Sequence, residues 1–223
     1  RGQLTLAHTD ATVRAFRQRA EVNKHFGGRT EMFDRQSIAE LVPCLNLDPA
    51  QLPVLAGLWH QDGATARHDA VAWGYARGAT QRGVELHQLT EVTGIESAAG
   101  QVTGVVTNRG KIACGTVIQA VAGHSAVMSQ KAGFPLPIVA YPLQAMVTLP
   151  VKPFLNPLVS SSALHCYVQQ TSRGEIVIGG GSDPYPLYNS RASLPLKESL
   201  IASAVDMFPF LSEMRLLRQW AGI

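Results

Sequence analysis

Residues 63–83 read GATARHDAVAWGYARGATQRG, and this stretch predicts a turn followed by one helix. Asp69 is the expected N-cap, because its carboxylate can accept a hydrogen bond from a free backbone N–H of the first turn. The helix is expected over residues 70–82 and to end at the glycine that follows. Gly74 and Gly78 lie one turn apart on it, at a cost of up to about 1 kcal/mol each relative to alanine. Either a backbone or a flat ligand approaches these glycines closely, or the helix simply tolerates them.

His68 directly precedes this predicted helix, and Arg67 lies beside it. A side chain at a helix N-terminus is close to converging N–H donors, which suit a phosphate or an electron-rich ring. The position alone leaves two interpretations open: a histidine that binds a ligand, or an ordinary surface histidine.

Strands and helices are expected on both sides of this stretch. The pattern predicts strands at residues 2–7, 84–89, 92–97, 102–107, 143–149, 165–170 and 175–178, and helices after Thr9 or Asp10, after Asp34 and over residues 196–208. Residues 116–121 are almost wholly apolar, which is typical of a strand buried on both faces. Such a mixture predicts the α/β class.

Two further groups of residues are candidates for a site. His124 follows Gly123 after the apolar segment 116–121, a frequent ligand-binding position in open α/β sheets. His165 and Tyr167 alternate on one predicted strand and therefore share a face, which either lines a pocket or faces solvent.

The glycine tract at residues 179–181 follows a strand, but no helix and no Lys-Ser/Thr pair come after it, so a phosphate loop is excluded. It is expected to be a glycine-rich strand end beside a ligand, or a plain loop. A Gly-x-Gly-x-x-Gly placed between strand and helix is absent as well.

Composition narrows the class of protein. The 223 residues are 46% hydrophobic and 16% charged, with a formal net charge of +3, which fits a soluble globular chain of one or two domains. Basic residues are scattered apart from Arg14, Arg17 and Arg19, so no nucleic-acid surface is expected. No apolar run reaches the roughly 18 residues of a membrane span. The first residues are not those of a signal peptide, and without a Met the chain is expected to lie inside a longer protein.

The cysteines and histidines indicate no metal centre. Cys44, Cys114 and Cys166 are far apart and odd in number, so they are expected to be reduced, buried residues, which favours the cytoplasm. No histidine pair has the spacing of metal ligands. A Ser-His-Asp hydrolase is not indicated either, because no Gly-x-Ser-x-Gly segment occurs.

Several segments together resemble one family. Residues 63–79, Glu91-Val92-Thr93-Gly94, Ala122-Gly123-His124-Ser125, Pro142-Leu143-Gln144-Ala145 and Arg218-Gln219-Trp220-Ala221-Gly222-Ile223 are similar to the beta subunits of heterotetrameric sarcosine oxidases, in order along essentially the whole chain. This resemblance implies a D-amino-acid-oxidase-like fold, with an antiparallel substrate-domain sheet and part of an FAD-binding domain. It implies substrate-domain parts at residues 1–54 and 136–223, and an FAD-domain part with the FMN-attachment segment at residues 55–135.

The resemblance also implies two flavins. FMN would be bonded through its 8α methyl group to His68, with Arg67 close to it, and Val92 would contact FAD through its backbone. Gly123 and His124 are weaker candidates for cofactor binding, and His165 and Tyr167 for the substrate pocket. The implied reaction converts sarcosine to glycine and formaldehyde, or passes the one-carbon unit to tetrahydrofolate. FAD accepts the hydride, and FMN passes electrons to oxygen to give hydrogen peroxide. The implied partners are alpha, gamma and delta subunits.

Two family segments are not found in these residues: the amino-terminal βαβ unit with its glycine fingerprint, and the carboxy-terminal glycine-rich segment with its lysine. The chain is therefore expected to be a fragment that binds FAD poorly and is inactive alone. Two alternatives stay open at this point: an enzyme for another secondary amine or amino acid, such as dimethylglycine, or a non-catalytic module for assembly with partner subunits.

Overall fold

The computed structural model describes residues 2–50 and 52–223, and the chain forms two compact units. Unit 1 comprises residues up to 65 together with 142–185 and 189–222; unit 2 comprises residues 66–141, 186–188 and 223. The chain therefore leaves unit 1 and returns to it. The division falls at 65/66 and 141/142, whereas the sequence places the domain boundaries at 54/55 and 135/136.

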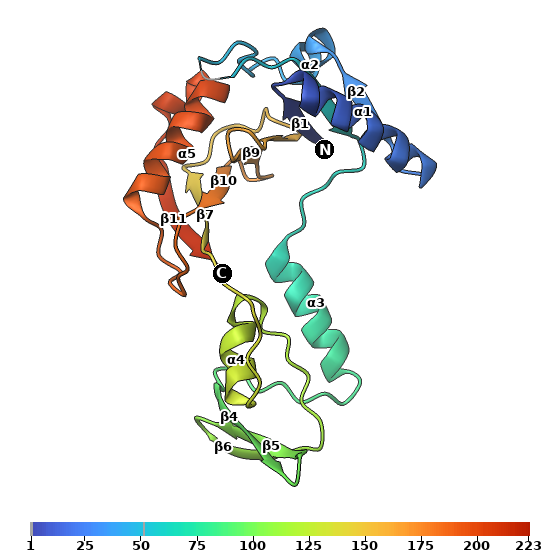
Figure 1. Ribbon diagram of the computed structural model, residues 1–223. Helices are drawn as coiled ribbons and strands as arrows, with labels where there is room; N and C mark the ends of the chain where they lie inside the picture. The colour runs from blue at the N-terminus through green and yellow to red at the C-terminus, as the bar shows by residue number, and fades with distance from the viewer. Residues whose placement is uncertain (1, 51) are drawn as a thin grey trace. The chain divides into compact units, whose positions relative to one another are not determined.

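Unit 1 is built on an eight-stranded mixed sheet with the order β11-β7-β10-β9-β8-β1-β3-β2 (Figure 1). Its strands are β1 (Gln3–Ala7), β2 (Thr30–Phe33), β3 (Ala56–His60), β7 (Leu143–Thr148), β8 (Leu158–Ser161), β9 (Cys166–Gln170), β10 (Ile176–Ser182) and β11 (Leu216–Gly222). Only β1 and β8 pair in parallel; the other neighbours are antiparallel. The predicted antiparallel sheet and mixed α/β class are thereby confirmed.

Two helices of unit 1 begin at the caps that the sequence predicts. Thr9 caps α1 (Asp10–His25) through a bond from Thr12 N to its hydroxyl, and Asp34 caps α2 (Arg35–Leu41) by accepting from Ser37 N at 2.8 Å. This bond from the Ser37 amide lowers the pKa of the Asp34 carboxyl. α5 (Leu194–Met207) follows Ser193 and leads into the 3₁₀ turn η2 (Pro209–Glu213).

The sheet of unit 1 has two different faces. Leu4, Leu6, Val159, Val168 and Ile178 belong to one buried apolar cluster with side chains of α2 and α5. Because side chains alternate across a strand, the residues between them project from the opposite face. Tyr167, Ser160, Thr5 and Leu58 are register neighbours from β9 through β8 and β1 to β3, so they form one row on that opposite face. α1 covers the end of this face over β2 and β3.

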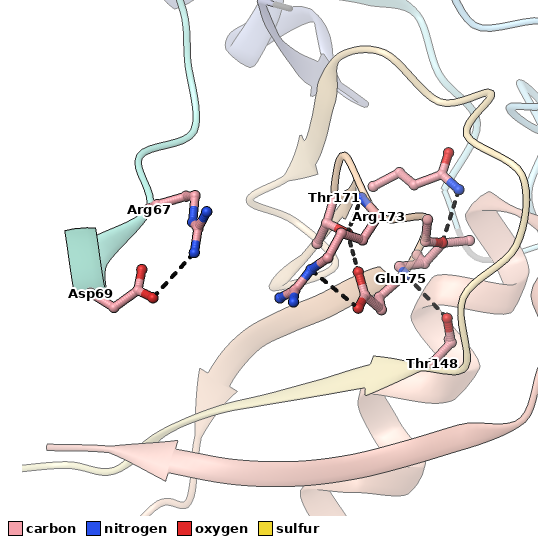
Figure 2. Close-up of polar contacts among 9 residues, drawn as sticks. Arg67, Asp69, Thr148, Thr171, Arg173 and Glu175 are labelled. Atoms are coloured by element: carbon pink, nitrogen blue, oxygen red, sulfur yellow. Dashed lines mark hydrogen bonds and ion pairs between the residues drawn. The ribbon is translucent and has the colours of Figure 1, made fainter. Parts of the chain in front are cut away.

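The hairpin between β9 and β10 is held by polar side chains (Figure 2). The Thr171 hydroxyl donates to the Glu175 carboxylate, and Arg173 Nε lies 3.7 Å from the same carboxylate. At the start of β10 the Ile176 amide donates to the Thr148 hydroxyl at 3.1 Å. These bonds hold the two ends of the hairpin turn together and connect the start of β10 to β7.

Unit 2 contains the helix predicted after His68 and a small sheet. α3 (His68–Thr80) precedes an antiparallel sheet with the order β4-β5-β6, formed by β4 (Val92–Ala98), β5 (Gln101–Thr107) and β6 (Gly110–Ala113). The 3₁₀ turn η1 (Ala122–His124) then leads into α4 (Ser125–Lys131). The strands predicted at 92–97 and 102–107 are confirmed.

Two of the strand predictions in unit 2 are wrong. Residues 116–121 form no strand, and Ile118 is 89% exposed. A strand of that composition needs paired neighbours on both edges, and no described segment pairs with it. Residues 84–89 are likewise irregular and exposed. Among the described helices, none combines the length and apolar character that crossing a membrane requires.

Candidate functional site

The N-terminus of α3 presents His68 and Arg67 at the surface. The helix begins at His68 itself, and its N-cap is Arg67, whose side chain makes no capping bond. The prediction that Asp69 is the N-cap and that the helix covers 70–82 is therefore wrong by two residues at each end. Asp69 lies in the first turn, where its carboxylate accepts from Ala70 N at 2.9 Å. That bond, followed by the nearby Arg67 and His68, lowers the pKa of Asp69.

The imidazole of His68 is exposed, and no described residue makes a hydrogen bond or ion pair with it. Arg67 forms an ion pair with Asp69 at 3.4 Å (Figure 2), which keeps the guanidinium beside the helix start. The arrangement leaves a free ring nitrogen at a helix N-terminus, where backbone N–H groups and the helix dipole favour an electron-rich or anionic group.

Within unit 2, most of the body of α3 is exposed as well. None of its residues is buried, and Trp73 and Tyr75 are 63% and 80% exposed. A Cβ added at Gly74 would meet nothing within 4 Å, and one at Gly78 would meet only Arg82 Nη1 at 3.6 Å. Within the described residues, close backbone approach therefore does not account for these two glycines.

Val92 lies at an open edge of the small sheet. Asn108 N donates to Glu91 O at 3.0 Å, so that pair is hydrogen-bonded and the next pair, Val92 with Thr107, is the non-hydrogen-bonded one. The backbone groups of Val92 consequently point away from β5, towards the free edge of β4. Lys131 Nζ, from α4, donates to the Val92 carbonyl at 3.3 Å. The backbone N–H of Val92 faces this free edge, where it can donate a hydrogen bond to a cofactor.

Gly123 and His124 lie in η1 and contact residues of unit 2. A Cβ at Gly123 would stand 2.7 Å from the carbonyl carbon of Ile223, so its small size serves that approach. The ring of His124 packs against the ring of Tyr188, with centroids 5.2 Å apart. Both residues are thus engaged by the protein itself.

In unit 1, the structure brings His165, Tyr167 and the glycine tract together. Tyr167 is opposite Gly179 in the β9–β10 register, and a Cβ at Gly179 would lie 2.5 Å from the Tyr167 hydroxyl. The phenol ring therefore lies over Gly179. A Cβ at Gly180, whose φ is +135°, would lie 2.0 Å from the carbonyl oxygen of His165. The close approach of these two residues explains Gly179 and Gly180.

His165 is not part of the strand, which starts at Cys166. It lies in the preceding turn with a φ of +48°, an uncommon conformation for a residue with a side chain. The strict alternation that predicts a shared face for His165 and Tyr167 is therefore broken at His165. His165 is exposed and Tyr167 is half-buried.

The ionisation of this region is set by burial. Burial raises the pKa of the Cys166 thiol to about 12. Burial also raises the pKa of the Tyr167 phenol above its ordinary value, and the neighbouring Cys166 adds to this. Tyr167 therefore stays protonated at neutral pH and can donate a hydrogen bond. Within residues 2–50 and 52–223 no three His, Cys, Asp or Glu side chains gather as metal ligands.

Sequence reasoning missed Lys131. Its contact with Val92 joins residues 39 positions apart, and no motif around Lys131 announces it. It also missed that Gly179 and Gly180 serve Tyr167 and His165, although their place at the end of a predicted strand was a signal. The candidates divide by unit: Arg67, His68, Val92, Gly123 and His124 belong to unit 2, and His165 and Tyr167 to unit 1.

The family of the chain follows from comparison with known proteins. The family model described as FAD dependent oxidoreductase matches residues 1–223, and the chain belongs to this family. Sarcosine oxidase subunit beta from Rhodobacter capsulatus is 42% identical over 223 residues, which are 100% of this chain and 54% of that protein. The subunit of the same name from Rhizobium meliloti is also 42% identical, with the same coverage. The resemblance to sarcosine oxidase beta subunits is thus confirmed, and the chain spans about half the length of these curated relatives.

A solved structure supports the fold. L-proline dehydrogenase from P.horikoshii superposes with a TM-score of 0.89 at 29% identity, covering 99% of this chain and 59% of the other. The expected membership among FAD-dependent, D-amino-acid-oxidase-like oxidoreductases is confirmed by both kinds of comparison.

Proposed function

We propose that this chain is part of a flavin-dependent oxidase of small secondary amines, with sarcosine as the substrate and glycine and formaldehyde as products. The observation that carries the proposal is the free, exposed imidazole of His68 at the start of α3, in a chain 42% identical to sarcosine oxidase beta subunits. When bound, FAD would supply hydride acceptance and FMN the transfer of electrons to oxygen, since flavins carry such chemistry and the protein positions them.

The residues of unit 2 fit the flavins as follows. His68 offers a ring nitrogen that has no hydrogen-bond partner among the described residues for a covalent bond to FMN, and Arg67 places a positive charge beside it. Val92 offers an outward-facing backbone N–H for FAD at the edge of β4. Gly123 and His124 are secondary candidates, because Ile223 and Tyr188 already occupy their near surroundings.

The substrate site is proposed at His165 and Tyr167 in unit 1. The Tyr167 phenol, whose pKa burial raises above its ordinary value, can donate a hydrogen bond to the carboxylate of an amino acid. The exposed His165 side chain lies in the turn that precedes the same strand. The substrate-domain and FAD-domain assignments of the two units belong to this proposal.

The assembly is proposed from the relatives, two of which are named as beta subunits. Alpha, gamma and delta subunits would complete a heterotetramer in the cytoplasm, where the free cysteines 44, 114 and 166 would stay reduced. Tetrahydrofolate would accept the one-carbon unit. The described residues alone would have little or no activity, because exposed apolar side chains such as Trp73 mark surface that needs covering.

The test is turnover by the complete protein co-expressed with its partner subunits, on sarcosine, dimethylglycine, L-proline and glycine. Sarcosine should give the highest kcat/KM. Preference for L-proline would favour another secondary amine instead, an alternative supported by the structural match to a proline dehydrogenase. Absence of turnover and of bound flavin would favour the assembly module.

A further inference from the structure

His8 is a buried histidine whose two ring nitrogens both have protein partners. Only 7% of the residue is exposed, and it directly follows β1. Its Nδ1 lies 3.0 Å from Leu52 O and 3.1 Å from Pro53 O. Carbonyl oxygens only accept hydrogen bonds, so Nδ1 carries the proton.

The other nitrogen contacts Ser161, the last residue of β8. His8 Nε2 and Ser161 Oγ are 2.8 Å apart, and Ser161 Oγ also accepts from Leu164 N at 3.1 Å. With Nδ1 protonated in the neutral ring, Nε2 is an acceptor, so the Ser161 hydroxyl proton points to His8. Ser161 is 1% exposed. One placement of the hydrogens therefore satisfies all of these hydrogen bonds. In it the Ser161 hydroxyl donates to His8 Nε2, and the same oxygen accepts from the Leu164 amide.

The Leu164 amide belongs to the turn that carries His165. This turn joins β8 to β9, and the His165 N–H donates to Ser162 O at 3.3 Å. His165 has a φ of +48°, and its carbonyl is held against the backbone of Gly180. A conformation of this kind persists only where the surroundings fix it. Ser161 fixes the turn from one side and Gly180 from the other.

We propose that His8 is a positioning residue of the substrate site: through Ser161 it fixes the turn from which His165 projects and from which Tyr167 follows on β9. This proposal rests on the proposed substrate role of His165 and Tyr167. His8 itself touches neither residue in the described contacts, and it acts through a hydroxyl 153 positions away in the sequence.

The experiment uses the complete protein assembled with its partner subunits. His8→Phe keeps a ring but removes both nitrogens, and Ser161→Ala removes only the hydroxyl. Each variant should raise KM for sarcosine about tenfold, corresponding to about 1.4 kcal/mol, with kcat changed less than KM. The double variant should raise KM no further than either single one, because both changes break the same connection. His25→Phe, an exposed histidine in the last turn of α1, is the control and should leave KM unchanged.

The outcomes separate this inference from the proposed function. His165→Ala and Tyr167→Phe are measured beside the other variants. If His165→Ala and Tyr167→Phe raise KM while His8→Phe and Ser161→Ala lower only the thermal midpoint, the substrate site stands and the positioning role of His8 is overturned. If they leave KM unchanged, the substrate site itself is misplaced and the inference fails with it. Should His8→Phe not fold, Ser161→Ala alone decides, since unchanged KM there overturns the role of His8.

Discussion

Replacing Gly180 by alanine should be severe, because two costs add at one residue. Its φ of +135° lies outside the range that residues with a Cβ readily adopt, and the new methyl group would lie 2.0 Å from the His165 carbonyl oxygen. The backbone cost is about 1–3 kcal/mol, and forcing a methyl group into a packed site costs about 1–3 kcal/mol more. We therefore expect a loss of roughly 2–6 kcal/mol in stability.

Gly27→Ala is the matched control for this prediction. Gly27 also has a positive φ, +81°, but a Cβ there would meet nothing within 4 Å. Gly27→Ala therefore loses only the free energy of the unfavourable backbone conformation. Each kcal/mol lowers the thermal midpoint by about 2–4 °C in a chain of this size. The midpoint of the complete protein is measured for both variants at one concentration and scan rate. If Gly180→Ala lowers it no more than Gly27→Ala does, the close approach of His165 to Gly180 is wrong.

Three further predictions concern neighbouring groups. Because the pKa of the Cys166 thiol is about 12, the thiol is protonated at pH 8, and iodoacetamide should leave it unmodified in the folded protein. Peptide mass spectrometry measures the labelling, and rapid labelling of Cys166 would contradict its burial. Gly179→Ala should displace the Tyr167 side chain, whose hydroxyl would lie 2.5 Å from the added Cβ, and should raise KM for sarcosine. The loss of stability should be smaller than for Gly180→Ala, since a side chain can move. The pKa of Glu175 is lowered below its ordinary value, mainly by the Thr171 hydroxyl. The contribution of the Glu175 carboxylate to folding stability is therefore present above pH 4.5 and lost as pH falls through the lowered pKa. Glu175→Gln should thus destabilise the protein more at pH 7 than at pH 3; an equal effect at both pH values would refute this.

Local signals predict the helices of unit 1 and most of the strands, and they fail where pairing depends on distant chain. Thr9 and Asp34 cap their helices as predicted, because capping needs only residues three positions apart. The apolar residues 116–121 were predicted to form a buried strand, but no described segment pairs with them. β2, β3, β6, β8 and β11 were missed, and all of these except β6 pair with segments far away in sequence.

The residue types of the candidate site could be predicted from the sequence, but the contacts that hold these residues in place could not. The motif around His68 is local and can be recognised in sequence. The support of His165 by Gly180 and the contact of Lys131 with Val92 arise only when strands and helices fold together. The same holds for Ser161 and His8, whose hydrogen bond spans 153 positions. No periodicity links such pairs.

The most direct test of the account is whether flavin stays attached to the denatured protein. The complete protein, co-expressed with its alpha partner, is precipitated with acid, washed and examined by absorbance and by mass spectrometry of its peptides. We predict that yellow colour remains with the peptide containing His68, that His68→Ala abolishes it, and that His87→Ala, at another exposed histidine of unit 2, retains it. Colour that washes away from the wild-type protein, or that survives in His68→Ala, would contradict the assignment of His68 as the attachment residue.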